Sequence, residues 1–157
     1  MGEQREPQWL DADEQQIWHA FAYLLIRLPA ALDTQIQRDA DISHFDYLVL
    51  SALSSDSEGA LRMSRLSHFT GGSLSRLSNV VAKLEKRGWV RREPDPDDGR
   101  ATRAVLTPDG WDKVVASAPS HVEEVRRLVF DALTKTQQRQ LGAISERLLA
   151  AIDPERS

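Results

Sequence analysis

A Gly-Gly pair at residues 71–72 interrupts a stretch that otherwise favours helix, and it limits the possible folds more than any other feature. Before this pair, the sequence predicts a short helix over residues 64–69, with the Ser64 hydroxyl as its N-cap. After the pair, the same signal at Ser73 begins a longer helix over residues 73–87. The sequence therefore predicts two helices joined by a tight turn.

Two strand-like stretches follow these helices, over residues 89–93 and 101–106. The proline, aspartate and glycine residues at 94–99, which lie between the stretches, are typical of a turn, so this part of the chain predicts a β-hairpin. Two helices, a tight turn and a hairpin occur in this order in a winged helix-turn-helix.

Helical periodicity flanks this unit on both sides. On the N-terminal side a helix begins near Asp11, and Pro29 predicts a kink or a break within it. On the C-terminal side Thr107 caps a further helical region, with breaks expected near Pro119 and near residues 133–134. The expected fold class is mostly α with a small β-hairpin wing (α+β), in one compact unit.

Charge is unevenly distributed along the chain. The net charge of −4 argues, as an average, against nucleic-acid binding, but residues 1–43 sum to −5, residues 44–107 to +2 and residues 108–157 to −1. Residues 62–92, the basic stretch, carry eight cations against the single acid Glu85. These cations are Arg62, Arg65, Arg76, Lys83, Lys86, Arg87, Arg91 and Arg92. A local charge of +7 predicts a phosphate-facing surface, and the alternative is an ordinary solvated helix face.

The helix over residues 73–87 separates apolar from polar side chains. At about 100° per residue, its apolar side holds Leu74, Leu77, Val80, Val81 and Leu84. Its polar side holds Ser75, Arg76, Asn79, Lys83 and Lys86. Arginine pairs with guanine, asparagine with adenine and serine with either, so the polar side is suited to the major groove of DNA.

The turn of the hairpin places Asp98 two residues before Arg100. An arginine at such a tip can enter a minor groove, where the negative potential is enhanced when the groove is narrow. The Asp98 carboxylate would hold the Arg100 guanidinium in one geometry. The alternative is an ordinary Asp-Gly turn with an exposed arginine.

Three segments resemble the MarR family of bacterial regulators. Residues 61–67 read LRMSRLS, where the family has an LRMSELA-like segment, and residues 75–90 resemble its recognition helix. Residues 98–110 fit the wing pattern DxRxxxxxLTxxG. The resemblance implies a homodimer in which helical segments 1–43 and 108–157 intertwine, and in which each lobe of residues 44–107 faces DNA.

The resemblance also implies which residues bind double-stranded DNA. Ser75, Arg76 and Asn79 would lie in the major groove, Ser73 near a phosphate, Arg100 in the minor groove with Asp98 orienting it, and Ser64 and Arg103 near the backbone. The implied function is a sequence-specific regulator, by family habit a repressor, acting on an inverted-repeat operator. The remaining alternative of this kind is a winged-helix module that binds protein or binds DNA without sequence preference.

Family members often release DNA when a small aromatic effector binds between the dimerisation helices and the winged lobe. The candidate lining residues here are Trp18, His19, Phe21, Tyr23, His44 and Tyr47, and the alternative is that these side chains are plain core. The chain has no cysteine, which excludes sensing through a thiol. His121 and Glu124 form the only ligand-like spacing among the histidines, so we expect no metal site and no cofactor.

An enzyme is the remaining class, and the sequence gives little support for it. It has no glycine-rich phosphate loop, nucleophile elbow or metalloprotease helix. The adjacent carboxylates of Asp97 and Asp98 lie in a turn open to water, where a raised pKa is not expected. The sequence also shows no membrane span and no secretory signal, so the expected location is the cytoplasm.

Overall fold

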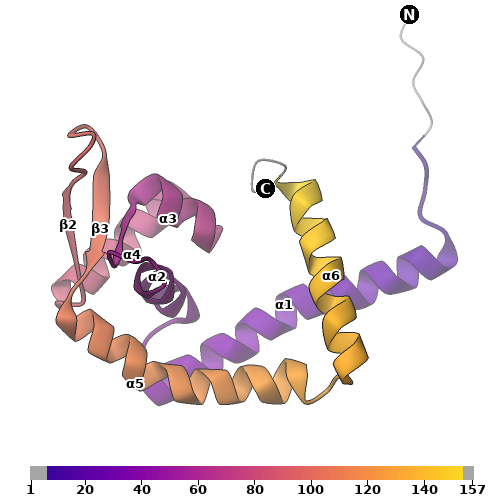
Figure 1. Cartoon of the computed structure of the whole chain (residues 1–157). Coiled ribbons are helices and arrows are strands. Elements are labelled where there is room, and N and C mark those ends of the chain that lie inside the picture. Colours follow the sequence, from indigo (N-terminus) through magenta and orange to yellow (C-terminus); the bar gives the residue numbers. More distant parts are fainter. Residues whose placement is uncertain (1–6, 154–157) are drawn as a thin grey trace, which may run out of the picture.

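Helices form most of the molecule, and three short strands form one sheet (Figure 1). The computed structural model describes residues 7–153. In chain order the elements are α1 (Ala12–Ala40), α2 (His44–Ser54), β1 (Ala60–Arg62), α3 (Met63–Thr70), α4 (Leu74–Lys86), β2 (Val90–Pro94), β3 (Thr102–Leu106), α5 (Pro108–Val125), the π-helical turn η1 (Arg126–Phe130) and α6 (Lys135–Ile152). This order confirms the predicted fold class of mostly α with a small β wing.

Neither internal proline breaks its helix: the break expected near Pro119 is wrong, and of the kink or break expected at Pro29 the break is wrong. Helix α1 continues through Pro29 and α5 continues through Pro119. A proline removes one helical hydrogen bond, and in α1 the packing of the following turns keeps the chain helical, because Ile36 after Pro29 is fully buried. The break expected at residues 133–134 is confirmed, because Thr134 caps the start of α6.

The predicted cap at Ser64 is wrong, whereas the cap at Ser73 is confirmed. Helix α3 begins at Met63, and its N-cap is Arg62, the last residue of β1, which makes no side-chain cap bond. Because the strand leads directly into the helix, Ser64 already lies in the first turn. Gly71 ends α3 with a φ of 64°, a left-handed conformation that favours glycine. Ser73 then accepts the backbone N–H of Arg76 at 3.2 Å.

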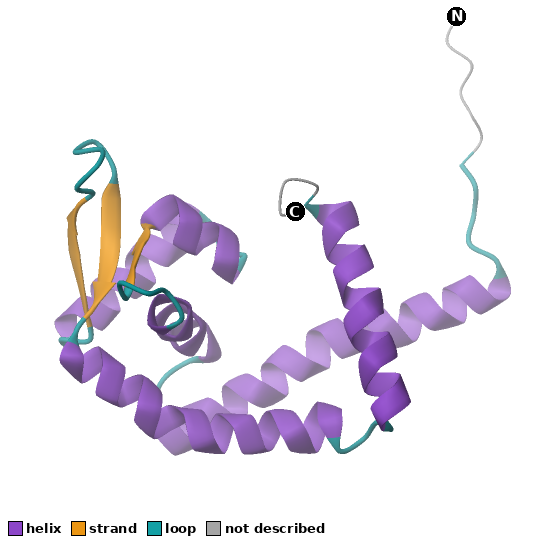
Figure 2. Cartoon of the chain, viewed as in Figure 1, coloured by secondary structure: helices purple, strands orange, loops and turns teal. Residues whose placement is uncertain are grey.

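The wing is a three-stranded antiparallel sheet, where the sequence predicted only a hairpin (Figure 2). Its order is β1-β3-β2, with Arg62 of β1 opposite Arg103 of β3 and Glu93 of β2 opposite the same residue. Strand β1 has three residues, which is too short for an alternating pattern to be recognised in the sequence. The sheet therefore joins the wing to the start of α3.

The main core lies around α2, which is covered by α3, α4, α5 and the sheet. The largest side chains without exposure include Leu50 and Leu53 of α2, Leu66 of α3, and Leu77 and Leu84 of α4. Ile36 and Ile42, which precede α2, belong to the same core. The winged lobe is thus one packed body together with the C-terminal end of α1.

The first half of α1 and all of α6 carry large apolar side chains at the surface. Ile26 of α1 is 68% exposed and Ile144 of α6 is 54% exposed. In Figure 1, α6 lies apart from the winged lobe, and at its end Asp153 binds the His68 ring of α3 at 2.8 Å. None of the described helices is both long and apolar enough to cross a membrane.

A close contact joins the start of α5 to the base of the wing. The Thr107 hydroxyl donates to the Gly88 carbonyl at 2.6 Å and accepts the Gly110 N–H at 3.0 Å. A Cβ at position 110 would lie 2.0 Å from the Trp89 carbonyl oxygen, so the approach requires glycine. Lys113, one turn further along α5, lies over the Trp89 ring and donates to the Ala40 carbonyl at 2.6 Å.

Candidate nucleic-acid interface

Helix α4 has the two sides that the sequence predicted, with one exception. Its fully buried residues are Leu77, Val81 and Leu84. Its exposed residues include Ser75, Arg76 and Asn79, which were assigned to the major groove. The exception is Leu74, which is 57% exposed and lies at the first turn rather than in the core. The described geometry therefore leaves the three candidate side chains accessible on one helix.

The Arg76 side chain is exposed, but its guanidinium lies against an aromatic ring. Its guanidinium carbon lies 4.1 Å from the centre of the Phe45 ring, a cation–π distance. Phe45 is buried in the second position of α2. The contact places the candidate base-reading arginine against the junction of α1 and α2.

A shallow groove of about 430 Å3 runs between α3, α4 and the wing. The residues lining it are Arg62, Met63, Ser64, Leu74, Ser78, Arg92, Ala101 and Thr102. Ser64 therefore faces the same space as α4, although it does not cap α3. Ser78 and Thr102 are polar residues of this groove that the sequence did not single out, and Arg92 was named only as a member of the basic stretch. Ser78 had a signal, since it lies one turn after Ser75 on α4.

At the wing tip, the Asp98 carboxylate accepts the backbone N–H of Arg100 at 3.1 Å. Asp98 therefore stabilises the turn through the backbone of Arg100, where the sequence suggested that it holds the guanidinium. Arg100 itself is exposed, as a groove contact requires. Arg100 belongs to the loop between β2 and β3, and this loop lies at the end of the sheet farthest from α5 (Figure 2).

Arg103 pairs within the sheet. Its guanidinium binds Glu93 of β2 at 2.6 Å and Glu58 at 3.4 Å, and its side chain is 22% exposed. The hydrogen bond from Arg103 lowers the pKa of Glu93, and the same bond raises the pKa of Arg103. Arg103 thus links β2, β3 and the loop before β1.

Most cations of the basic stretch form ion pairs with acids. Glu85 is the one of these acids that lies within the stretch, and the others lie outside it. The ion pairs are Arg62–Asp95, Lys83–Asp46, Arg87–Asp41, Arg91–Glu93 and Arg92–Glu85. Arg65 and Arg76 instead lie over the rings of Phe69 and Phe45. Within residues 7–153, Lys86 is the member of the stretch with neither kind of contact. The local charge of +7 therefore overstates the positive surface.

The candidate effector residues do not all line one cavity in one protomer. His44 lines an open cavity of about 590 Å3 together with Asp33 and Arg76. Trp18 and His19 lie about 14 residues before Asp33 on α1, which is roughly 20 Å along a helix. Tyr47 is buried and packs against His121 instead, with ring centres 4.5 Å apart.

His44, Tyr47 and His121 form a cluster between α2 and α5. The ring centres of the two histidines are 5.7 Å apart. Burial lowers the pKa of His44, although the Asp33 charge opposes this, and burial and the neighbouring His44 lower the pKa of His121. Burial also raises the pKa of the Tyr47 hydroxyl. Burial therefore favours the neutral form of both imidazoles.

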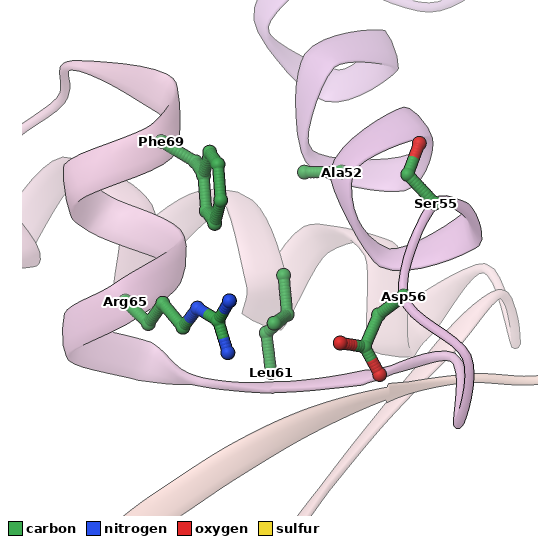
Figure 3. Close-up of a pocket in the computed structure, with 6 residues that line it drawn as sticks. All are labelled: Ala52, Ser55, Asp56, Leu61, Arg65 and Phe69. Carbon is green, nitrogen blue, oxygen red and sulfur yellow. The ribbon is translucent and has the colours of Figure 1, made fainter. Parts of the chain in front are cut away.

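The other candidate features bind partners within the chain. Glu124, which the sequence paired with His121 as metal ligands, binds Arg127 at 2.6 Å. Among the described residues no group of three or more ligand-type side chains could hold a metal ion. A small pocket of about 230 Å3 between α2 and α3, lined by Ala52, Ser55, Asp56, Leu61, Arg65 and Phe69, contains none of the candidate effector residues (Figure 3).

Comparison with known proteins identifies the family. A family model described as MarR family matches residues 41–101. The transcriptional repressor MprA of Escherichia coli K12 is 29% identical over 107 residues, which cover 68% of this chain. The match spans 60% of the length of MprA.

Two solved structures from Streptomyces coelicolor match over almost the whole chain. Sco3205, a MarR family transcriptional regulator solved in complex with DNA, is 41% identical, with a TM-score of 0.90 and coverage of 98% of this chain and 96% of its own. AbsC, also a MarR family regulator, is 30% identical, with a TM-score of 0.86 and coverage of 95% and 100%. On this likeness, the chain belongs to the MarR family of transcriptional regulators, which are not enzymes.

Proposed function

We propose that this protein is a sequence-specific regulator that binds double-stranded DNA as a homodimer and represses transcription from an inverted-repeat operator. The observation that carries the proposal is the exposed face of α4, on which Ser75, Arg76 and Asn79 are all accessible. Arg100, exposed at the wing tip, is positioned for a neighbouring minor groove. Sco3205, which is 41% identical, was solved with DNA. The name of MprA supports repression.

The residues assigned to the DNA backbone would complete this interface. Ser73 lies at the N-terminus of α4, where a phosphate is favoured by the helix dipole, and Ser64 faces the groove. Asp98 and Arg103 support the interface from within the wing, through the turn and through the sheet. We also propose that the protein acts in the cytoplasm of a bacterial cell, since its family consists of DNA-binding regulators.

The exposed apolar faces support the homodimer. Isolated apolar residues are common on protein surfaces, but a series along α1 and α6 is typical of an interface. On α6 the series is Leu141, Ile144, Leu148 and Ile152, and on α1 it includes Ile17, Trp18, Leu25 and Ile26. Segments 1–43 and 108–157 would supply these helices, and the two lobes of residues 44–107 would face one side of DNA.

We propose that the effector is a small aromatic molecule that binds in the cavity lined by His44, Asp33 and Arg76. Such a molecule would compete for the Arg76 guanidinium and so reduce DNA binding. Trp18 and His19 could contribute only from a second copy, whose α1 would have to reach this cavity. Tyr47 lies behind the cavity and supports His44 through the histidine cluster.

Selection of bound sequences from a random DNA pool tests the proposal. We expect an inverted repeat whose half-sites are separated by about one helical turn. Arg76→Ala should cost about 1–3 kcal/mol and relax the choice of base at one position in each half-site. Binding without sequence preference would instead support the architectural module. Selection in the presence of phenolic acids should give weaker recovery of the same sequence.

A further inference from the structure

An ion pair between Arg62 and Asp95 connects two segments that are far apart in the sequence. The Arg62 Nε and Nη2 atoms donate to the two Asp95 oxygens at 2.8 and 2.9 Å. This two-bond geometry fixes both the distance and the orientation of the two groups. Asp95 was not among the DNA-binding candidates, and Arg62 was named only as a member of the basic stretch.

The pair spans the width of the sheet. Arg62 ends β1 and stands at the start of α3, whereas Asp95 follows the last residue of β2. Strand β3 lies between β1 and β2 in the sheet. The pair therefore connects the helix-turn-helix directly to the loop that carries the wing tip.

The Asp95 carboxylate also organises that loop. Its Oδ1 atom accepts the backbone N–H groups of Asp97 and Asp98, both at 3.0 Å. The loop is closed by two backbone bonds, from the Asp95 N–H to the Ala101 carbonyl at 2.9 Å and from the Ala101 N–H to the Asp98 carbonyl at 2.8 Å. Arg100 lies inside this closed turn, so its backbone position follows that of Asp95.

Burial distinguishes this pair from an ordinary surface ion pair. The Asp95 side chain is 7% exposed, whereas that of Arg62 is 45% exposed. The hydrogen bonds from Arg62 are the main cause of a lowered pKa of Asp95. Removal of either partner would leave the other without its compensating charge, and for the buried carboxylate that is costly. The loop would then lose the orientation that the pair provides.

We propose that Arg62 and Asp95 are positioning residues that hold the wing loop, and with it Arg100, at a fixed place relative to α3 and α4. This inference rests on the proposed DNA-binding function. The wing tip would otherwise be attached only through β2 and β3, and a shift of the loop would move Arg100 away from its groove. The pair thus determines how strongly the wing contributes to DNA binding.

The main rival role for Arg62 is a direct contact with a DNA phosphate, because its side chain is partly exposed in the groove. Asp95→Asn separates the two roles, since they predict opposite results. Loss of the carboxylate would free Arg62 for a phosphate and maintain or strengthen binding. If the pair is a positioning device, Asp95→Asn must weaken binding to the selected operator, on the order of tenfold, as Arg62→Ala does.

A double-mutant cycle with Arg100→Ala tests whether the pair acts through the wing tip. We expect Arg62→Ala and Asp95→Asn to weaken binding in the wild-type background and to have almost no effect when Arg100 is already alanine. Arg91→Ala is the matched control, because Arg91 pairs with Glu93 on an exposed part of β2. Its effect should be smaller and should not depend on Arg100.

Arg62→Lys keeps the charge but loses the two-bond geometry, and it remains informative if Asp95→Asn fails to fold. It should weaken binding in an Arg100-dependent way and reduce hydroxyl-radical protection of the minor groove at the wing positions. The inference would be overturned if the losses of binding caused by the Arg62 variants were the same with and without Arg100→Ala. It would also be overturned if Asp95→Asn bound as well as wild type. If the wild-type protein selects no sequence, the proposed function fails instead.

Discussion

The winged lobe and the terminal helices differ in how many of their apolar side chains are buried and how many of their charged side chains are paired. In the lobe, Leu50, Leu66 and Leu84 have no exposure, and most cations are paired. In α6, none of the described residues is buried, and α1 has buried residues only in its last part, at Leu32, Gln35 and Ile36. The lobe is therefore stabilised by its own contacts, whereas the first half of α1 and all of α6 leave large apolar side chains exposed.

Charged substitutions on α6 should give the largest effect. Ile144→Glu combined with Leu148→Glu places two carboxylates on the apolar face, so we expect a monomer in place of the proposed dimer. Light scattering coupled to sizing chromatography measures the mass. The far-ultraviolet circular dichroism of the variant should still show a folded, mostly helical protein. Glu146→Gln, at an exposed position of the same helix, is the control. A dimer that persists in the double variant would contradict the proposed interface.

A core substitution in the lobe should come next in size. Leu50→Ala creates a cavity at the centre of the packed body, and we expect the free energy of unfolding to fall by about 2–5 kcal/mol. Urea denaturation at constant protein concentration measures the change. Leu48→Ala on the same helix should cost less, because Leu48 is 37% exposed. Equal losses for the two variants would show that the core is not centred on Leu50.

The histidine cluster between α2 and α5 should make stability depend on pH. The folded state lowers the pKa of His44 and His121, whereas the unfolded chain takes up protons near pH 6.5. The free energy of unfolding should therefore fall as the pH drops below about 6.5, by at most about 1.4 kcal/mol per pH unit for each histidine, and by less because both are partly exposed.

Denaturation at pH 7.5 and pH 6.0 measures this dependence. His121→Phe keeps a ring against Tyr47 but removes one of the two titrating groups, so the difference between the two pH values should shrink. His19→Gln, at an exposed position of α1, should leave it unchanged. An undiminished difference in His121→Phe would assign the pH effect to other groups.

The smallest expected effect concerns Lys86, the cation of the basic stretch that forms neither an ion pair nor a contact with an aromatic ring within residues 7–153. Lys86→Ala should reduce the salt dependence of operator binding by about one unit of slope, since one phosphate contact is lost. Titrations at several salt concentrations measure the slope. Lys135→Ala, on α6, is the control and should leave the slope unchanged. An unaltered slope in Lys86→Ala would place Lys86 away from DNA.

Features that depend on neighbouring residues could be predicted from the sequence. The caps at Ser73 and Thr107 act on backbone groups three residues later, so their signal is local. The same holds for the apolar side of α4, where only Leu74 departs from the pattern. Together with the MarR-like motifs, these local signals were enough to predict the fold class.

Features that depend on distant residues could not be predicted in this way. Helix α1 continues through Pro29 because later residues pack in the core, which no local rule contains. The partners of Lys83 and Arg87 are Asp46 and Asp41, which lie outside the stretch whose charge was summed. The Arg62–Asp95 pair joins residues 33 positions apart, so the sequence assigned the orientation of Arg100 to the nearer Asp98.

The Gly110 contact has a mechanical consequence. Because no Cβ separates α5 from the Trp89 carbonyl, and Thr107 bonds to both sides, the start of α5 and the base of β2 move as one piece. In the proposed dimer, a small change in the angle between the two α5 helices would be amplified at the two wing tips. The spacing of the half-sites that the protein accepts would then be set far from the DNA, by the angle between the two α5 helices.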